Sequence, residues 1–179
     1  MEVKNLTKTQ CNNIYNNMYQ RCYNEGVHKT KPWYIGCTMC EEWLDDKYAF
    51  YDWVNDGNFY VIDGEPTVEL DKDILIKGNK FYSPDTCIFV PKSINSLFGG
   101  TSAKKNNKEL PVGVSQTKSG KYRPEIKGFH ETFETIEDAW EVWKTHKMAT
   151  VIHKADEYLG KIPMKLYNAM LNYKFEITD

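Results

Sequence analysis

The sequence predicts an α+β protein, because the spacing of its apolar residues changes from a helical period to short extended runs and back. Apolar and aromatic side chains recur every three or four positions over residues 9–24 and again over residues 41–54. Extended segments are expected after them, at 59–62, 68–75 and 87–90. A short helix from Pro91 through Leu97 would complete a first region in which helices surround a small hairpin.

The second part is predicted to be a three-stranded antiparallel sheet packed on a long helix. Its strands are expected at 112–114, 121–126 and 131–133. Ser119 and Gly120 mark the turn of a hairpin between the first two strands. In the middle strand charged side chains alternate with apolar ones, so one face is polar and the other can pack on a helix.

The long helix has recognisable start and stop signals. Thr135 with Asp138 three residues later resembles a capping box, and the apolar stripe that follows reaches Leu159. Gly160 is placed to end this helix, and Pro163 suits the first turn of a last helix.

The segment between the two parts is small, polar and basic, which is typical of a boundary or linker. Its sequence is GGTSAKKNNKE, residues 99–109. We therefore expect a first region over 1–99, a basic linker over 100–109 and a second domain over 110–179.

Charge is distributed by region in this chain. Its 179 residues carry a formal net charge of −2, which by itself does not indicate a nucleic-acid partner. Between residues 100 and 130, however, seven lysine or arginine side chains stand against two acids, Glu109 and Glu125. A local positive field is enough to bind phosphates. Duplex DNA is therefore one candidate partner, and a solvated lysine loop is the alternative.

Composition indicates a soluble cytoplasmic protein. The first ten residues are polar, and no stretch has the length and apolar composition of a membrane span. The five cysteines are an odd number without a secretory context, which indicates reduced thiols. Four of the side chains could be zinc ligands, namely Cys22, His28, Cys37 and Cys40. A second closely spaced cysteine pair is missing, so buried thiols are expected rather than zinc.

Three acids at alternate positions, Glu69, Asp71 and Asp73, precede a Gly-Asn-Lys turn. A strand would place their carboxylates side by side on one face, where oxygen ligands can hold a divalent cation. The row can equally be the solvated face of an edge strand whose other face packs inward through Leu70, Ile74 and Ile76. A half-buried strand alternates in the same way, so both interpretations stay open.

The stretch LPVGVSQTKSGKYRPEIKGFHETFETIEDAWEVW, residues 110–143, resembles a known DNA-binding domain. It is similar to the sheet-and-helix domain of the plant APETALA/ethylene-response type, which phage homing endonucleases also carry. The resemblance implies that the sheet enters the major groove of duplex DNA, with Arg123 as the best candidate for a base contact. The other DNA-binding candidates are Lys104, Lys105, Lys108, Gln116, Lys118, Lys121 and Lys127.

The stretch GNKFYSPDTCIFVPKSIN, residues 78–95, resembles the second half of a His-Asn-His (HNH) nuclease motif. The resemblance implies a β-hairpin and a helix that hold one divalent metal. Its ligands would be Asp71, Asp73 and Asn95, whose oxygens suit magnesium or manganese.

One catalytic part of that motif is missing here. Its general base is a histidine on the first strand, and this chain has no histidine between Gly57 and Phe129. Lys72 is a basic side chain near that place. Loss of a positioned base typically costs ~10²–10⁴-fold in rate, so the HNH-like region is expected to be degenerate.

Three functions are consistent with these patterns. The first is a sequence-preferring double-stranded DNA-binding protein of phage or mobile-element type, descended from an HNH homing endonuclease whose cleavage is weak or lost. The second is an active, metal-dependent endonuclease of the same ancestry. The third is a protein-interaction module that uses the basic sheet to bind an acidic partner.

Overall fold

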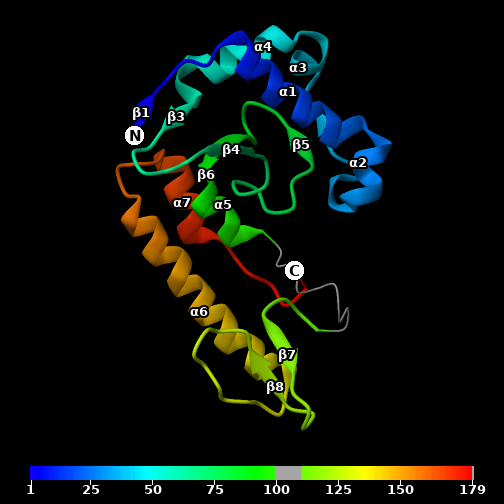
Figure 1. The fold of residues 1–179 in the computed structure, drawn as a ribbon, viewed down its shortest axis with the longest axis vertical. Helices are drawn as coiled ribbons and strands as arrows, with labels where there is room; N and C mark the ends of the chain where they lie inside the picture. Colours follow the sequence, from blue (N-terminus) through cyan, green and yellow to red (C-terminus); the bar gives the residue numbers. More distant parts are fainter. Residues whose placement is uncertain (100–109, 179) are drawn as a thin grey trace. The chain divides into compact units, whose positions relative to one another are not determined.

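The computed structural model describes residues 1–99 and 110–178 and confirms the mixed α+β class. The chain forms two compact units (Figure 1). Unit 1 comprises Met1–Ser96 with Gly160–Ala169, and unit 2 comprises Leu97–Leu159 with Met170–Asp179. The expected linker lies outside the described residues, and the sequence-based domain division stays a prediction. Among the residues described, no helix is both long enough and apolar enough to cross a membrane.

Unit 1 begins with two helices in succession. Helix α1 spans Lys8–Tyr23, and the capping box between Thr7 and Gln10 starts it. Helix α2 spans Glu25–Thr30, and the side chain of Asn24 accepts a hydrogen bond from the backbone N–H of Val27 at its start. The helix expected over 9–24 is therefore confirmed.

The single helix expected over 41–54 is wrong in one respect, because Asp46 divides it. The backbone of Asp46 is extended, and its carboxylate accepts a 2.8 Å hydrogen bond from the N–H of Tyr48. Asp46 thus ends α3, Glu41–Asp45, and caps α4, Lys47–Trp53. The chain leaves α4 through a wide turn, Val54–Asn58, in which Gly57 has a positive φ of 79°.

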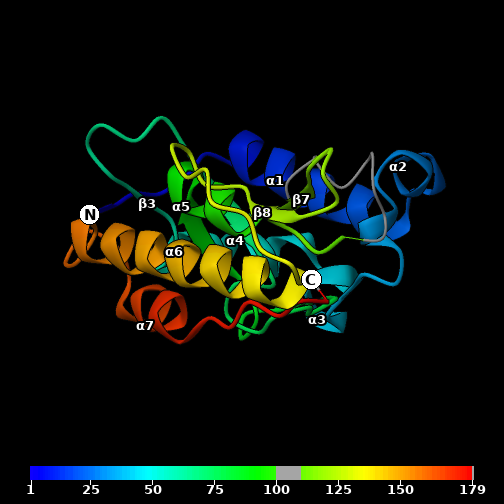
Figure 2. The same ribbon diagram turned by 90° about the horizontal axis from the view of Figure 1, so that it is seen from below.

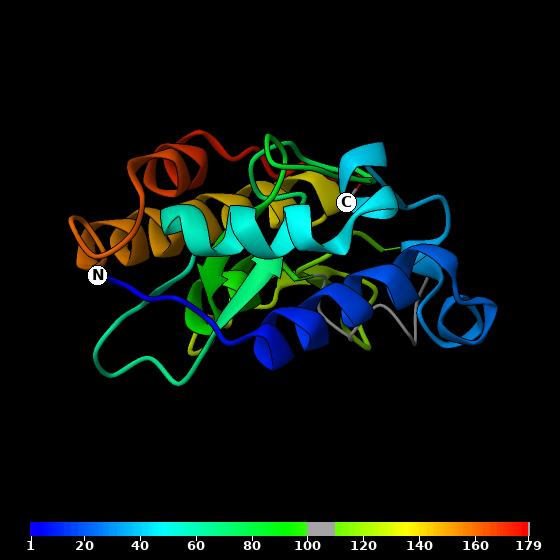
Figure 3. The ribbon, with the colours of Figure 1, turned by 90° about the horizontal axis from the view of Figure 1, so that it is seen from above.

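An aromatic cluster joins these helices to the sheet below them. The ring of Trp43 on α3 lies 5.0 Å from Phe50 and 5.1 Å from Trp53, and Trp53 stacks on Phe89 at 5.9 Å. The hydroxyl of Tyr15 on α1 donates to the Trp43 carbonyl at 3.0 Å. Helices α1 and α4 lie side by side (Figure 3), and the rings of Tyr15 and Phe50 meet between them at 5.9 Å. Burial of so many rings makes it the main apolar core of unit 1.

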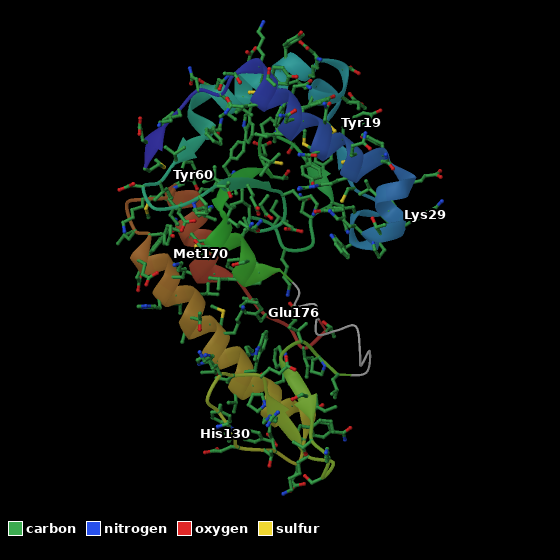
Figure 4. The ribbon with its side chains drawn as sticks, in the orientation of Figure 1. Tyr19, Lys29, Tyr60, His130, Met170 and Glu176 are labelled. Carbon is green, nitrogen blue, oxygen red and sulfur yellow. The ribbon has the colours of Figure 1, made fainter. Side chains whose placement is uncertain are left out.

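The strands of unit 1 pair in three short ladders. Strand β4, Val68–Asp71, is antiparallel to β6, Ile88–Pro91, and helix α5, Lys92–Phe98, follows β6 directly. Strand β5, Phe81–Tyr82, is parallel to β2, Thr38–Met39. The third ladder joins β1, Glu2–Val3, to β3, Tyr60–Val61. The buried hydroxyl of Tyr60, labelled in Figure 4, donates to the Phe89 carbonyl at 2.7 Å and links that ladder to β6.

The predicted strand over 68–75 is too long, since β4 ends at Asp71. The Gly-Asn-Lys segment is also not a tight turn between two strands that pair with each other. Residues 72–80 form a loop, and the strand that follows it pairs with β2 instead of β4.

Unit 2 is built on a hairpin and a long helix. Strand β7, Val114–Gln116, is antiparallel to β8, Tyr122–Pro124, and a hydrogen bond from the N–H of Gly120 to the carbonyl of Thr117 closes the loop. The expected third strand is reduced to one antiparallel bridge between Tyr122 and Phe133. Their backbones exchange hydrogen bonds of 2.8 and 2.7 Å.

Helix α6, Ile136–Glu157, covers one face of the hairpin (Figure 2). The side chain of Thr135 accepts a hydrogen bond from the Asp138 N–H and donates one to its carboxylate, which starts the helix as predicted. Gly160, with a φ of 74°, follows its end, and α7 spans Met164–Asn172.

The chain at the start of the hairpin comes close to the helix at Gly113. Its φ is 83°, and a Cβ built on it would lie 2.1 Å from the indole of the buried Trp143. Glycine is therefore required here twice, for its backbone conformation and for the space that it leaves. The N–H of Glu125 donates to the Gly113 carbonyl at 2.7 Å and holds the extension of β8 to the same residue.

We predict that Gly113→Ala lowers the free energy of unfolding by about 2–5 kcal/mol, because a strained φ and overpacking act together. Gly120→Ala is the matched control: its φ is 88°, but nothing lies within 4 Å of an added Cβ. It should cost only about 1–2 kcal/mol. Urea unfolding followed by tryptophan fluorescence measures both changes. Equal losses of unfolding free energy in the two variants would show that overpacking against Trp143 adds nothing to the cost at Gly113.

Candidate functional site

The face of the hairpin opposite α6 carries Arg123 and Lys121. Val114 and Pro124 are paired across the strands and buried, whereas Ser115 and Arg123, the next pair, lie on the other face. Arg123 is exposed, together with Lys121 and Glu125 two positions to either side, as the alternation in the sequence predicts. Among residues 1–99 and 110–178, the Arg123 guanidinium has no hydrogen-bond or ion-pair partner.

Two of the DNA-binding candidates on this hairpin already have partners within the chain. Lys121 forms a 2.5 Å ion pair with Glu134. Gln116 lies on the pleat face opposite Arg123, and its amide donates to the Gly120 carbonyl at 3.0 Å. The residue beside Arg123 is therefore Ser115, which the sequence analysis missed. The sequence could have shown this pairing, because the length of the three-residue loop after Thr117 fixes which residues of the two strands lie opposite each other.

The remaining basic candidates are placed more simply. Lys118 is exposed in the hairpin loop, and Lys127 is exposed in the turn that follows β8. Lys104, Lys105 and Lys108 lie outside the described residues.

In unit 1, Asp71 is used to end a strand. Its Oδ1 accepts hydrogen bonds from the backbone N–H groups of Asp73 and Ile74, at 2.9 and 2.7 Å. A side chain that takes these two donors turns the chain out of the ladder. Only Glu69 and Asp71 therefore share a strand face, and Asp73 lies in the loop.

The loop after Asp71 is closed by a reciprocal pair. The ammonium of Lys72, which is buried, donates to the Asn79 carbonyl at 2.7 Å and to the Asp73 carboxylate at 2.9 Å. The Asn79 amide donates back to the Lys72 carbonyl at 2.7 Å. Lys72 also lies over the ring of Tyr82, 5.8 Å from its centroid. These contacts hold the ammonium as a hydrogen-bond donor that fixes the loop.

Asn95 on α5 contacts a different acid from the two expected ones. Its Nδ2 donates to the carboxylate of Glu69 at 2.8 Å. Each carboxylate of the row thus has a separate partner: Asn95 for Glu69, two backbone amides for Asp71, and Lys72 for Asp73. Within the part of the chain that the structure describes, no three His, Cys, Asp or Glu side chains are grouped to hold a metal ion.

The environment of Asp71 changes its acidity. Burial first, and the nearby carboxylate of Asp73 second, raise the pKa of Asp71 to about 6. The two backbone hydrogen bonds act in the opposite direction but are the smaller effect.

The cysteines considered for zinc are separated by strand β2. Cys37 lies just before β2 and Cys40 just after it. Cys37 is buried near Cys22, and burial raises the pKa of both thiols, that of Cys22 to about 12. His28 contacts the Arg21 carbonyl through Nε2 at 2.8 Å.

Comparison with protein-family models, with curated proteins and with solved structures finds no match for this chain.

We predict that Asp71→Asn raises stability at neutral pH but not in acid. Because the folded-state pKa of Asp71 is raised, the protonated carboxyl stabilises the fold fully below about pH 4, and this contribution is lost as the pH rises through 6. Asparagine keeps the acceptor and cannot ionise. The difference in free energy of unfolding should grow from near zero at pH 4 to on the order of 2 kcal/mol at pH 7.5.

Asp71→Ala is the control for this measurement, since it removes the charge and the acceptor together. It should destabilise at every pH because two backbone donors lose their partner. Urea unfolding from pH 4 to 8 measures both variants. A pH-independent effect of Asp71→Asn would contradict the raised pKa.

Proposed function

We propose that this chain is a sequence-preferring double-stranded DNA-binding protein that reads the major groove with the β7–β8 hairpin. The observation that carries the proposal is the exposed guanidinium of Arg123, which has no partner among the residues that the structure describes and lies on the hairpin face that α6 leaves uncovered. A two-stranded ribbon fits the major groove, and an arginine fork can address guanine O6 and N7 together.

Local charge supports this orientation. Residues 110–130 contain four basic side chains, Lys118, Lys121, Arg123 and Lys127, and one acid, Glu125. Lys121 shares its charge with Glu134, so Lys118 and Lys127 are the candidates among the described lysines for phosphate contacts. Ser115, opposite Arg123, adds a short hydroxyl that can reach either a base edge or a phosphate.

Binding is favoured over cleavage by what surrounds the acids of unit 1. Each carboxylate is occupied by a partner from the chain itself, and residues 68–98 contain no histidine to serve as a general base. The set Asp71, Asp73 and Asn95 does not fit a shared magnesium or manganese site, because Asn95 pairs with Glu69 and Asp73 with Lys72.

The test begins with selection of duplexes from a random library by the full chain, followed by fluorescence anisotropy at several salt concentrations. We expect one enriched sequence, bound more tightly than random duplex, with affinity that falls as salt rises. No salt-dependent binding to any duplex would reject the proposal and favour an acidic protein partner for the hairpin.

We predict that Arg123→Ala weakens binding to the selected duplex by ~1–3 kcal/mol and reduces discrimination at one base pair. Arg123→Lys is the matched control: it keeps the charge but loses the fork, so discrimination should fall while binding to random duplex stays unchanged. Lys127→Ala should weaken selected and random duplexes alike and reduce the salt slope by about 1. Equal effects of all three variants on both duplexes would rule out a reading role for Arg123.

A second candidate function, metal-dependent endonuclease activity, is favoured by one observation. Strand β4 pairs antiparallel with β6, and β6 runs directly into α5, which resembles the hairpin and helix that the HNH resemblance implies. Supercoiled plasmid incubated with magnesium or manganese tests it. Nicking that Glu69→Gln and Asn95→Ala both abolish would establish a site around that pair. If the plasmid stays intact for hours with the protein in excess, the endonuclease function is rejected and DNA binding is the remaining candidate.

A further inference from the structure

Unit 1 exposes a group of aromatic and apolar side chains next to lysines, far along the chain from the hairpin of unit 2. We call it the Trp33 surface and define it by Trp33, Ile35 and Phe81 with four lysines, Lys29, Lys31, Lys77 and Lys80. Trp33 is 60% exposed, Ile35 58% and Phe81 42%.

Pairing of β2 with β5 brings the two segments of this surface together. Thr38 lies opposite Phe81 in the parallel ladder, and both are exposed, whereas the next pair, Met39 and Tyr82, is buried. The ammonium of Lys80 also donates to the Trp33 carbonyl. The segment that carries Phe81 and the turn that carries Trp33 are therefore neighbours in space, although 48 positions separate the two residues in the sequence.

Exposure of these side chains is fixed by local structure. Trp33 lies in a single 3-10 turn, Pro32–Tyr34, that the N–H of Ile35 closes on the Pro32 carbonyl at 3.0 Å. The neighbouring ring, Tyr34, packs under the guanidinium of Arg21 at 5.3 Å. Tyr34 thus anchors the turn to α1, while more than half of the Trp33 side chain remains exposed to solvent.

The two segments that carry these rings contain lysines but no acids. Residues 26–40 and 74–84 together contain four lysines and no aspartate or glutamate, in a chain with 25 acids and a net charge of −2. All four lysines are exposed, and Lys29 lies on α2 at the margin of unit 1 (Figure 4). Exposed rings accompanied by four exposed lysines fit a polyanion that also offers flat apolar faces.

We propose that the Trp33 surface binds single-stranded nucleic acid, with bases stacked on Trp33 and Phe81 and phosphates along the lysines. Unpaired bases have free π-faces, whereas the bases of a duplex are stacked on one another and cannot reach a surface indole. Stacking platforms in a basic setting are the means by which single strands are held without sequence preference. An anionic membrane is the competing occupant, since tryptophan and lysine also suit its interface.

The proposal does not depend on duplex reading by unit 2. It concerns other residues, another unit and another form of nucleic acid. Arg123→Ala should leave single-strand binding unchanged, so failure of either proposal is visible by itself.

The experiment measures binding of a fluorescein-labelled 20-nucleotide oligothymidylate to the full chain by anisotropy. Trp33→Leu keeps apolar bulk but loses the ring and should weaken binding by about fivefold or more. Trp33→Phe keeps a ring and should remain within about twofold of the unchanged chain. Tyr48→Ala, at a ring that is 51% exposed on α4, is the control for loss of an aromatic elsewhere in unit 1.

The lysines are tested by salt dependence. Lys29→Gln combined with Lys31→Gln should lower the slope of log affinity against log salt by about 1.4, or 0.7 for each phosphate contact. Lys47→Gln on α4 is the matched exposed control and should leave the slope unchanged.

Three results would overturn the proposal. These are absence of binding to the oligonucleotide, equal binding by Trp33→Leu and Trp33→Phe, and sedimentation with phosphatidylserine vesicles that is lost in Trp33→Leu. Circular dichroism of each variant verifies that the exposed substitutions leave the fold intact.

Discussion

The two hydrogen bonds that Asp71 accepts from the backbone determine how unit 1 is built after β4. They end the strand and direct the chain into a loop that Lys72 and Asn79 then close. Because the loop is closed, the segment that leaves it meets β2 rather than returning along β4. Both the parallel β2–β5 ladder and the exposed ring of Phe81 follow from that one change of direction.

Acids at alternate positions, as in the row Glu69, Asp71 and Asp73, can stabilise the fold itself rather than form a metal site. A strand with acids at alternate positions is compatible with a metal site, but here each acid satisfies a group of its own chain. Carboxylates that accept hydrogen bonds within the chain stabilise turns and helix contacts, and they are then not available to a ligand. The three acids of this row therefore support the geometry of unit 1.

Sequence patterns predicted what is decided locally. The Thr135–Asp138 pair located one helix start, and the alternation around Arg123 located the polar face of the hairpin. The break at Asp46 and the early end of β4 were missed because each depends on a carboxylate that competes with the backbone for hydrogen bonds. The β2–β5 pairing joins segments more than 40 residues apart, and no local period contains that information.

The close approach of Gly113 to the Trp143 indole also bears on the rate at which the hairpin would bind the proposed duplex. A hairpin seated directly on a helix has little freedom to rock, so its outward side chains are held at one height and angle before any partner arrives. Preorganisation of this kind removes the entropy cost of ordering a loop on binding and lets encounter be followed by docking without rearrangement. A bulkier residue at position 113 would loosen the packing of the hairpin on α6, and the proposed recognition of duplex DNA would then be slower even where the protein remained folded.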